Sequence, residues 1–304
     1  MLSLWIPITI AAAFLQNLRS VMQKVIKGRL STMGAAYARF FYAWPFAILY
    51  VAALSVWGGF ALPEPNPVFL AWCFAGGLCQ ILFTVVLLWL FSFRSFAIGT
   101  VFSKLEIVLI AILGAVLLGD TVGPAAILAI VVGAAGTLCL AASAARLSFA
   151  GLLRDLGDRA TLIGLLSAAL LGASVVCFRG AALSLDGPDF VMAAGFTLAV
   201  ALVMQTLMMG AWFAVFDRAE MVAVIREWRH ALPVGVVGMV CSVCWFTAFT
   251  LQNAAYIRAL GQVELIFAFL AGVFFFREPV SRSEIAGAIL ITGAILLILL
   301  AEVP

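Results

Sequence analysis

The chain is poor in charged residues, and this shortage sets the first limit on what it can be. Only 10% of its 304 residues are Asp, Glu, Lys or Arg, and 66% are hydrophobic; a typical soluble domain carries about 25% charged residues. Too few polar side chains are present to cover a water-soluble globule, so its solvent is a lipid bilayer. A single histidine, His230, and six scattered cysteines also leave no cluster typical of a metal site.

The sequence is rich in long apolar runs. A helix needs about 20 mainly apolar residues to cross about 30 Å of hydrocarbon. Ten such runs can be read along the chain: 3–24, 32–56, 67–91, 95–118, 122–143, 161–183, 188–215, 231–252, 255–276 and 283–301. The runs are too long for the strands of a membrane barrel. The sequence therefore predicts an all-α integral membrane protein with ten transmembrane helices.

The basic residues are distributed unevenly between the two ends of these helices. Twelve of the seventeen Lys and Arg fall in the connections that follow odd-numbered helices, four lie within spans, and Arg258 alone is assigned to the opposite side. Since basic loops stay in the cytoplasm, this bias predicts that both termini face away from the cytoplasm.

A weak internal repeat relates the two halves of the chain. Residues 99–122 align with residues 257–280 at an offset of 158, which places Glu106 on Glu264. The same alignment places Asp120 on Glu278, and a slip of two residues brings Arg19 onto Arg179.

The repeat divides the chain into two groups of five helices. We expect a first repeat over residues 1–143, a charged linker over 144–160 and a second repeat over 161–304. Because five is odd, the second repeat enters the membrane inverted. Inverted repeats are typical of secondary transporters, whose substrate site lies near the membrane midplane between the repeats.

Within this plan, each fourth helix ends on an acidic residue before a short fifth helix, in "LLGDTVGPAAILAIVVGAAG" and "FFFREPVSRSEIAGAILITGAILL", and "ARF" (38–40) lies early in the second helix. In these features the chain resembles ten-helix, EamA-type members of the drug/metabolite transporter superfamily. The resemblance implies a transporter. Because the chain has one histidine and its loop carboxylates show no ligand spacing, we expect neither an enzyme nor a cofactor. Members of this family usually keep both termini in the cytoplasm, which is opposite to the orientation that the charge bias predicts.

Two glutamates lie deep inside predicted helices. Glu106 is about ten residues into its run, which is about 15 Å at 1.5 Å per residue, and Glu264 is at similar depth. A charge at that depth costs about 3 kcal/mol on insertion scales, so we expect Arg19 to pair with Glu106 and Arg179 with Glu264. Lys104 is expected to face away from Glu106. The candidate substrate-binding or coupling residues are Glu106, Glu264, Arg19, Arg179, Arg39, Tyr42, Lys104 and Gln16.

Two interpretations of these charges remain open. The pairs either clasp neighbouring helices together, or they line a cavity that binds the charged groups of a substrate or exchanges a proton. Four basic residues against two glutamates favour an anionic or zwitterionic metabolite, such as an amino acid. Alternatives are an exporter of cationic drugs, a channel, a membrane enzyme or a non-transporting scaffold.

The expected surroundings follow from these points. The partners would be the lipid bilayer, a small-molecule substrate and, for a coupled transporter, protons; no nucleic acid is expected. The expected location is a bacterial inner membrane, crossed many times.

Overall fold

The computed structural model describes residues 3–26, 29–90, 93, 96–145, 157–187, 189–274 and 281–301. Within these ranges all regular secondary structure is helical, and no strand is found there. The all-α prediction is therefore confirmed. Most of the predicted linker 144–160 and the carboxylate Glu278 lie outside the described residues.

Among the described residues, eight helices are long and apolar enough to cross a membrane. They are Thr32–Val56, Pro67–Leu90, Ile98–Leu118, Pro124–Ser143, Arg159–Leu183, Phe190–Phe216, Trp228–Leu251 and Arg282–Leu300. Each falls on one of the predicted runs. The protein is thus a multi-pass integral membrane protein.

Two predicted spans, 3–24 and 255–276, are not among the eight. The first is a continuous helix, α1 (Trp5–Ile26), whose mean hydropathy is lowered by polar residues such as Gln16 and Arg19. The second is interrupted, because α13 (Ala254–Gly261) ends before α14 (Val263–Phe274) begins. A total of ten spans therefore stays a prediction.

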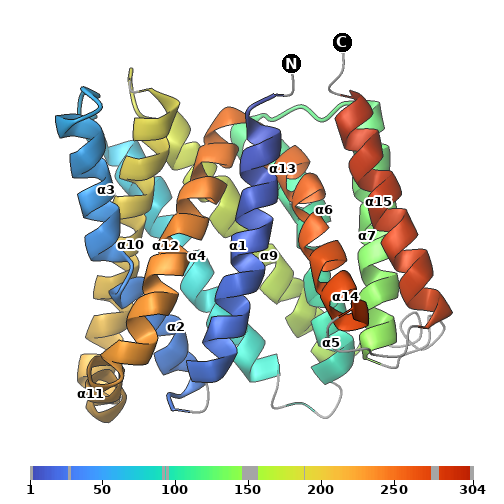
Figure 1. Cartoon of the computed structure of the whole chain (residues 1–304), viewed down its shortest axis with the longest axis horizontal. Coiled ribbons are helices and arrows are strands. Elements are labelled where there is room, and N and C mark those ends of the chain that lie inside the picture. Colours follow the sequence, from blue (N-terminus) through green and yellow to red (C-terminus); the bar gives the residue numbers. More distant parts are fainter. Residues whose placement is uncertain are drawn as a thin grey trace. The chain divides into compact units, whose positions relative to one another are not determined.

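The chain packs as two compact units, of which unit 1 comprises residues 1–81 and 177–252. Besides α1 it contains α2 (Thr32–Phe41), α3 (Trp44–Val56), α10 (Phe190–Phe216), α11 (Arg218–Arg226) and α12 (Trp228–Leu251), with parts of α4 (Pro67–Leu90) and α9 (Arg159–Leu183). In this unit α1 lies along α12, and α10 packs against α2, α3 and α12 (Figure 1). The buried side chains of Phe40, Met192, Leu198 and Phe213 lie at its centre.

Unit 2 comprises residues 82–176 and 253–304. It contains α5 (Phe96–Phe102), the 3₁₀ turn η1 (Ser103–Leu105), α6 (Glu106–Leu118), α7 (Pro124–Ala144), α13, α14 and α15 (Arg282–Ala301), with the remainder of α4 and α9. α7 and α15 run side by side (Figure 1). A Cβ added at Gly136 would lie 2.9 Å from the carbonyl oxygen of Gly287. Glycine lets these two backbones approach closely, as is common between membrane helices.

The two units do not coincide with the two predicted repeats. Each unit combines helices from both halves of the sequence, and the unit boundaries fall within α4 and α9. The repeat division at residues 143 and 161 stays a prediction about sequence symmetry. The two units are defined by tertiary contacts, which join helices from both halves of the sequence.

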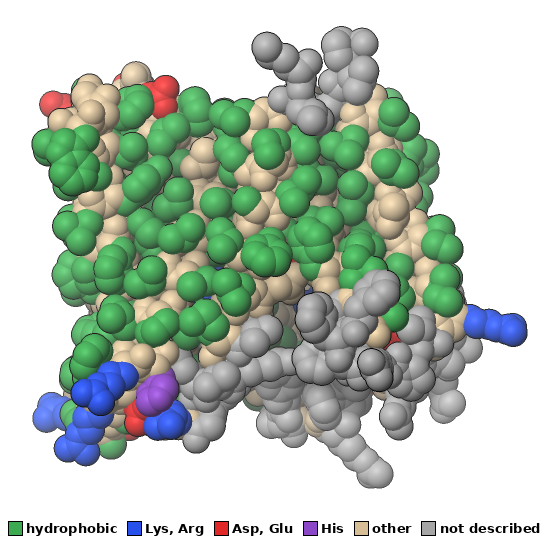
Figure 2. Space-filling model, viewed as in Figure 1, with side chains coloured by type: hydrophobic (Ala, Val, Ile, Leu, Met, Phe, Trp, Pro, Cys, Tyr) green, Lys and Arg blue, Asp and Glu red, His purple; other side chains and the backbone are tan. Residues whose placement is uncertain are grey.

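The surface of unit 1 fits a lipid environment. Large apolar side chains are exposed on it, for example Leu207 and Val215 on α10, at 66% and 71%. Exposure of such side chains would be costly in water. In Figure 2 hydrophobic side chains cover this unit between its ends, and Lys and Arg gather at the end that holds α11. Arg29 in the loop after α1 reaches Glu227 in this end, at 3.4 Å.

Candidate functional site

The helices that carry the two glutamates are both interrupted just before the glutamate. α5 gives way to the 3₁₀ turn η1, and α6 then begins at Glu106. In the other half, α13 ends at Gly261 and α14 begins at Val263, one residue before Glu264. At the offset of 158 these two interruptions fall on equivalent positions.

Local chemistry accounts for each interruption. The hydroxyl of Ser103 donates a hydrogen bond to the carbonyl of Thr100, 2.8 Å away, and such bonds from a side chain to the preceding turn bend membrane helices. At the second interruption Gly261 supplies a residue of low helix propensity. Hydropathy predicts an unbroken apolar run at both places, because a break that leaves a run apolar does not lower its hydropathy.

Each break places its glutamate in the first turn of a new helix. The macrodipole at a helix start favours a negative charge by about 0.3–1 kcal/mol. The interrupted helices therefore supply part of the stabilisation that a carboxylate within an apolar span requires.

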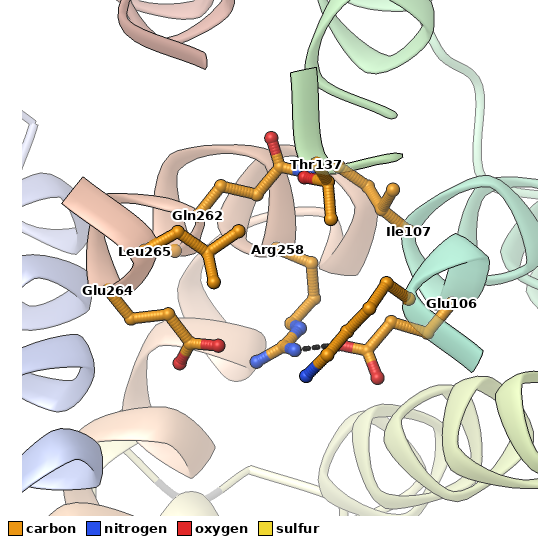
Figure 3. A pocket seen from close by; sticks show the side chains of 9 residues that line it. Glu106, Ile107, Thr137, Arg258, Gln262, Glu264 and Leu265 are labelled. Carbon is orange, nitrogen blue, oxygen red and sulfur yellow. Dashed lines mark hydrogen bonds and ion pairs between the residues drawn. The ribbon is translucent and has the colours of Figure 1, made fainter. Parts of the chain in front are cut away.

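The partner of Glu106 is Arg258 of α13. The two side chains form a hydrogen-bonded ion pair, and each is only 14% exposed. Figure 3 shows the Arg258 guanidinium lying between Glu106 and Glu264, with its dashed bond to Glu106. The predicted pairing of Glu106 with Arg19 is thus replaced by one within unit 2, to which both Glu106 and Arg258 belong.

The start of α13 is fixed by polar contacts. The side chain of Asn253 caps the helix by accepting a hydrogen bond from the N–H of Ala255 at 2.8 Å. One residue on, the hydroxyl of Tyr256 accepts a hydrogen bond from the N–H of Gly123 at 3.2 Å. From its place near the start of an apolar run, Arg258 is expected at the membrane surface. The cap at Asn253 could have signalled that Arg258 lies a full turn inside a helix.

A cavity of about 30 Å³ adjoins the ion pair. Its lining comprises Lys104, Glu106, Ile107, Thr137, Arg258, Gly261, Gln262, Glu264 and Leu265 (Figure 3). Residues of both predicted repeats therefore meet in it. Lys104, expected to face away from Glu106, lines the same cavity, because the 3₁₀ turn rotates residues 103–105 by about 120° per residue rather than 100°.

Two polar atoms beside this cavity lack a hydrogen-bond partner in the structure. They are the hydroxyl of Thr137 and the amide oxygen of Gln262, and both are buried. Buried polar atoms are nearly always hydrogen-bonded, and a cavity of about 10–15 Å³ already holds one water. The site therefore has the size and the polarity to hold one or two waters next to the carboxylates.

The remaining predicted site residues lie in unit 1. Arg19 of α1 and Arg39 of α2 both border Gly238 of α12: a Cβ added there would lie 3.4 Å from Cδ of Arg19 and 3.5 Å from Cγ of Arg39. Gln16 accepts a hydrogen bond from the indole N–H of Trp245 at 3.0 Å.

Tyr42 and Arg179 have structural contacts in the same unit. The hydroxyl of Tyr42 donates to the carbonyl of Val224 at 3.0 Å. Arg179 donates from Nη1 to the carbonyls of Phe249 and Gln252, the latter at 2.5 Å, at the end of α12. The carbonyls at a helix end attract a cation, so Arg179 caps α12, and its predicted pairing with Glu264 stays a prediction.

Comparisons with known proteins bear on the fold and the family. Residues 159–300 match the EamA-like transporter family. No curated protein matches the chain. Among the solved structures that match, one crystal structure has a TM-score of 0.69 and 20% sequence identity, over 99% of this chain and 98% of that chain. At this level of identity the likeness concerns the fold.

Proposed function

We propose that the protein is a secondary active transporter of a small organic metabolite, because residues 159–300 match the EamA-like transporter family. The substrate would be an amino acid or another zwitterionic or anionic compound. Transport would follow alternating access around a midplane site between two inverted five-helix repeats.

One observation carries this proposal: two helix breaks at repeat-equivalent positions, each followed by a glutamate, meet at one polar cavity. Discontinuous helices at the midplane are typical of the ion and substrate sites of transporters with inverted repeats. The ten-span plan is further supported by α1, whose 22 residues would extend about 33 Å.

The cavity suits a coupling ion better than a metabolite. Pockets that bind small organic ligands measure about 300–1,000 Å³, at least ten times the space of about 30 Å³ found here. A proton needs no more than a carboxylate and a connecting water. We therefore assign Glu106 and Glu264 to proton coupling.

The arrangement of charges gives this coupling a mechanism. Two carboxylates, Glu106 and Glu264, lie on either side of the Arg258 guanidinium, and the exposed Lys104 lies at the same cavity. Protonation of Glu106 would remove its charge and release Arg258 toward Glu264. A guanidinium that changes partner would move α13 relative to α6, so that proton binding is coupled to a conformational step.

The charges at the ends of unit 1 support an orientation. Arg218, Arg226 and Arg229 lie at the end that holds α11, while Glu64 and Asp186 lie in loops joined near Asn66, whose amide donates to Ser184 O at 2.7 Å. By the positive-inside rule, the α11 end would be cytoplasmic and both termini would face out. A bacterial inner membrane is the setting that we propose.

The proposal can be tested with purified protein in liposomes that contain a pH-sensitive dye. A panel of amino acids and small carboxylic acids is added outside, and the internal pH is recorded. We expect at least one compound to drive proton movement with the natural protein. Glu106→Gln and Glu264→Gln should each abolish it, because glutamine keeps the shape of glutamate but carries no titratable proton.

The matched control is Glu64→Gln, which neutralises a carboxylate in an exposed loop. It should leave proton movement unchanged. If both cavity variants transport protons at the natural rate, the assignment of these glutamates to coupling is wrong.

A further inference from the structure

The membrane-spanning helices of unit 1 contain basic side chains but no acidic ones. Asp and Glu are absent from the sequence of α1, α2, α3, α10 and α12, and from residues 67–81 and 177–183. The cations Arg19, Arg39 and Arg179 lie within these helices. A charge inside a span is costly unless it is paired or hydrogen-bonded.

The charge of Arg179 is stabilised by hydrogen bonds to two carbonyls at the end of α12. Arg19 and Arg39 are in a different position. Arg19 lies seven residues before the end of α1, and Arg39 seven residues after the start of α2. At 1.5 Å per residue both are about 10 Å from the same end of the unit.

The two side chains converge on one glycine. Their aliphatic stems both contact the position where Gly238 of α12 lacks a side chain, and like charges held near each other within a span repel. Nε of Arg19 is buried and has no hydrogen-bond partner in the structure. The guanidinium of Arg39 lies over the ring of Phe40, 4.5 Å from its centre. An aromatic face leaves the N–H groups at the guanidinium edge available for a ligand.

We infer that Arg19 and Arg39 form a binding site for an oxyanion, the carboxylate or phosphate group of a small solute. Two guanidiniums present planar, forked donors that match such groups with paired hydrogen bonds. A bound oxyanion would also relieve the repulsion between the two cations. The role of this site in recognising the anionic group of a substrate rests on the proposed transport function. The binding of an oxyanion to the two arginines does not depend on that function.

The test uses the full-length protein in detergent and measures its melting temperature. Sodium acetate and sodium phosphate are each titrated at constant ionic strength, with sodium chloride as the balancing salt. A ligand that binds the folded state at about a hundred times its Kd should raise the melting temperature by about 5–10 °C. The stronger of the two probes tells whether the site takes a carboxylate or a phosphate.

Three variants make the result specific. Arg19→Gln and Arg39→Gln should each abolish the response to the oxyanion. Without oxyanion, each should melt no lower than the natural protein, because each removes one of two like charges. Arg179→Gln is the matched control: it should melt lower, since it uncaps α12, but should keep the response.

Two results would overturn the inference. One is a response that is absent from the natural protein or equal in all variants. The other is a sharp loss of stability in Arg19→Gln, which would mean that Arg19 is paired with a carboxylate. Neither result depends on transport, so this inference and the proposed function can fail separately.

Discussion

The ion pair between Arg258 and Glu106 offers the most direct test of the site. Both side chains are 14% exposed, so removal of one partner leaves a largely buried charge without its counter-charge. That loss costs roughly 3–5 kcal/mol, while removal of both partners is often almost neutral. Arg258→Met should therefore destabilise the protein strongly, and the addition of Glu106→Leu should restore much of the stability.

The expected change is large enough to measure by thermal unfolding. For a unit of about 150 residues, 1 kcal/mol shifts the melting temperature by about 2–4 °C. Arg258→Met should thus lower it by roughly 6–20 °C. Glu106→Leu alone should cost less, because Arg258 then still has Glu264 beside it (Figure 3).

Lys104→Met is the matched control for this cycle. Lys104 lines the same cavity but is exposed, and exposed charges contribute about 0–1 kcal/mol. Its loss should therefore shift the melting temperature by at most a few degrees. The reasoning is refuted if the effects of Arg258→Met and Glu106→Leu add within about 0.5 kcal/mol, since residues that interact are not additive.

Two further predictions concern packing and orientation. Gly164→Ala should lower the melting temperature, because its Cβ would clash with the carbonyl of Gly99; overpacking typically costs about 1–3 kcal/mol. Gly293→Ala has open space and should have no such effect; equal effects of the two variants would contradict the packing. A cysteine at Glu64 should react with an impermeant thiol reagent added outside intact cells, and one at Arg229 only after lysis. The reverse pattern would place both termini in the cytoplasm.

The site could be predicted only in part. Glu106 and Glu264 were found from their depth in apolar runs and from the repeat, and both line the cavity. Arg258 was missed as their neighbour because its place near the start of a run suggested the membrane surface. A guanidinium on a long side chain can reach any carboxylate on a neighbouring helix, and the sequence does not state which helices are neighbours.

The sequence by itself determined the solvent, the helical class and the positions of the deep charges. These properties depend on composition and on hydropathy along a single helix, which are local. Tertiary structure decided that α5 and α6 are separated by a 3₁₀ turn, that Lys104 shares a cavity with Glu106, and that Arg179 caps α12. Each of these depends on contacts between segments distant in the chain or on a break that leaves hydropathy unchanged, so only the folded chain could settle them.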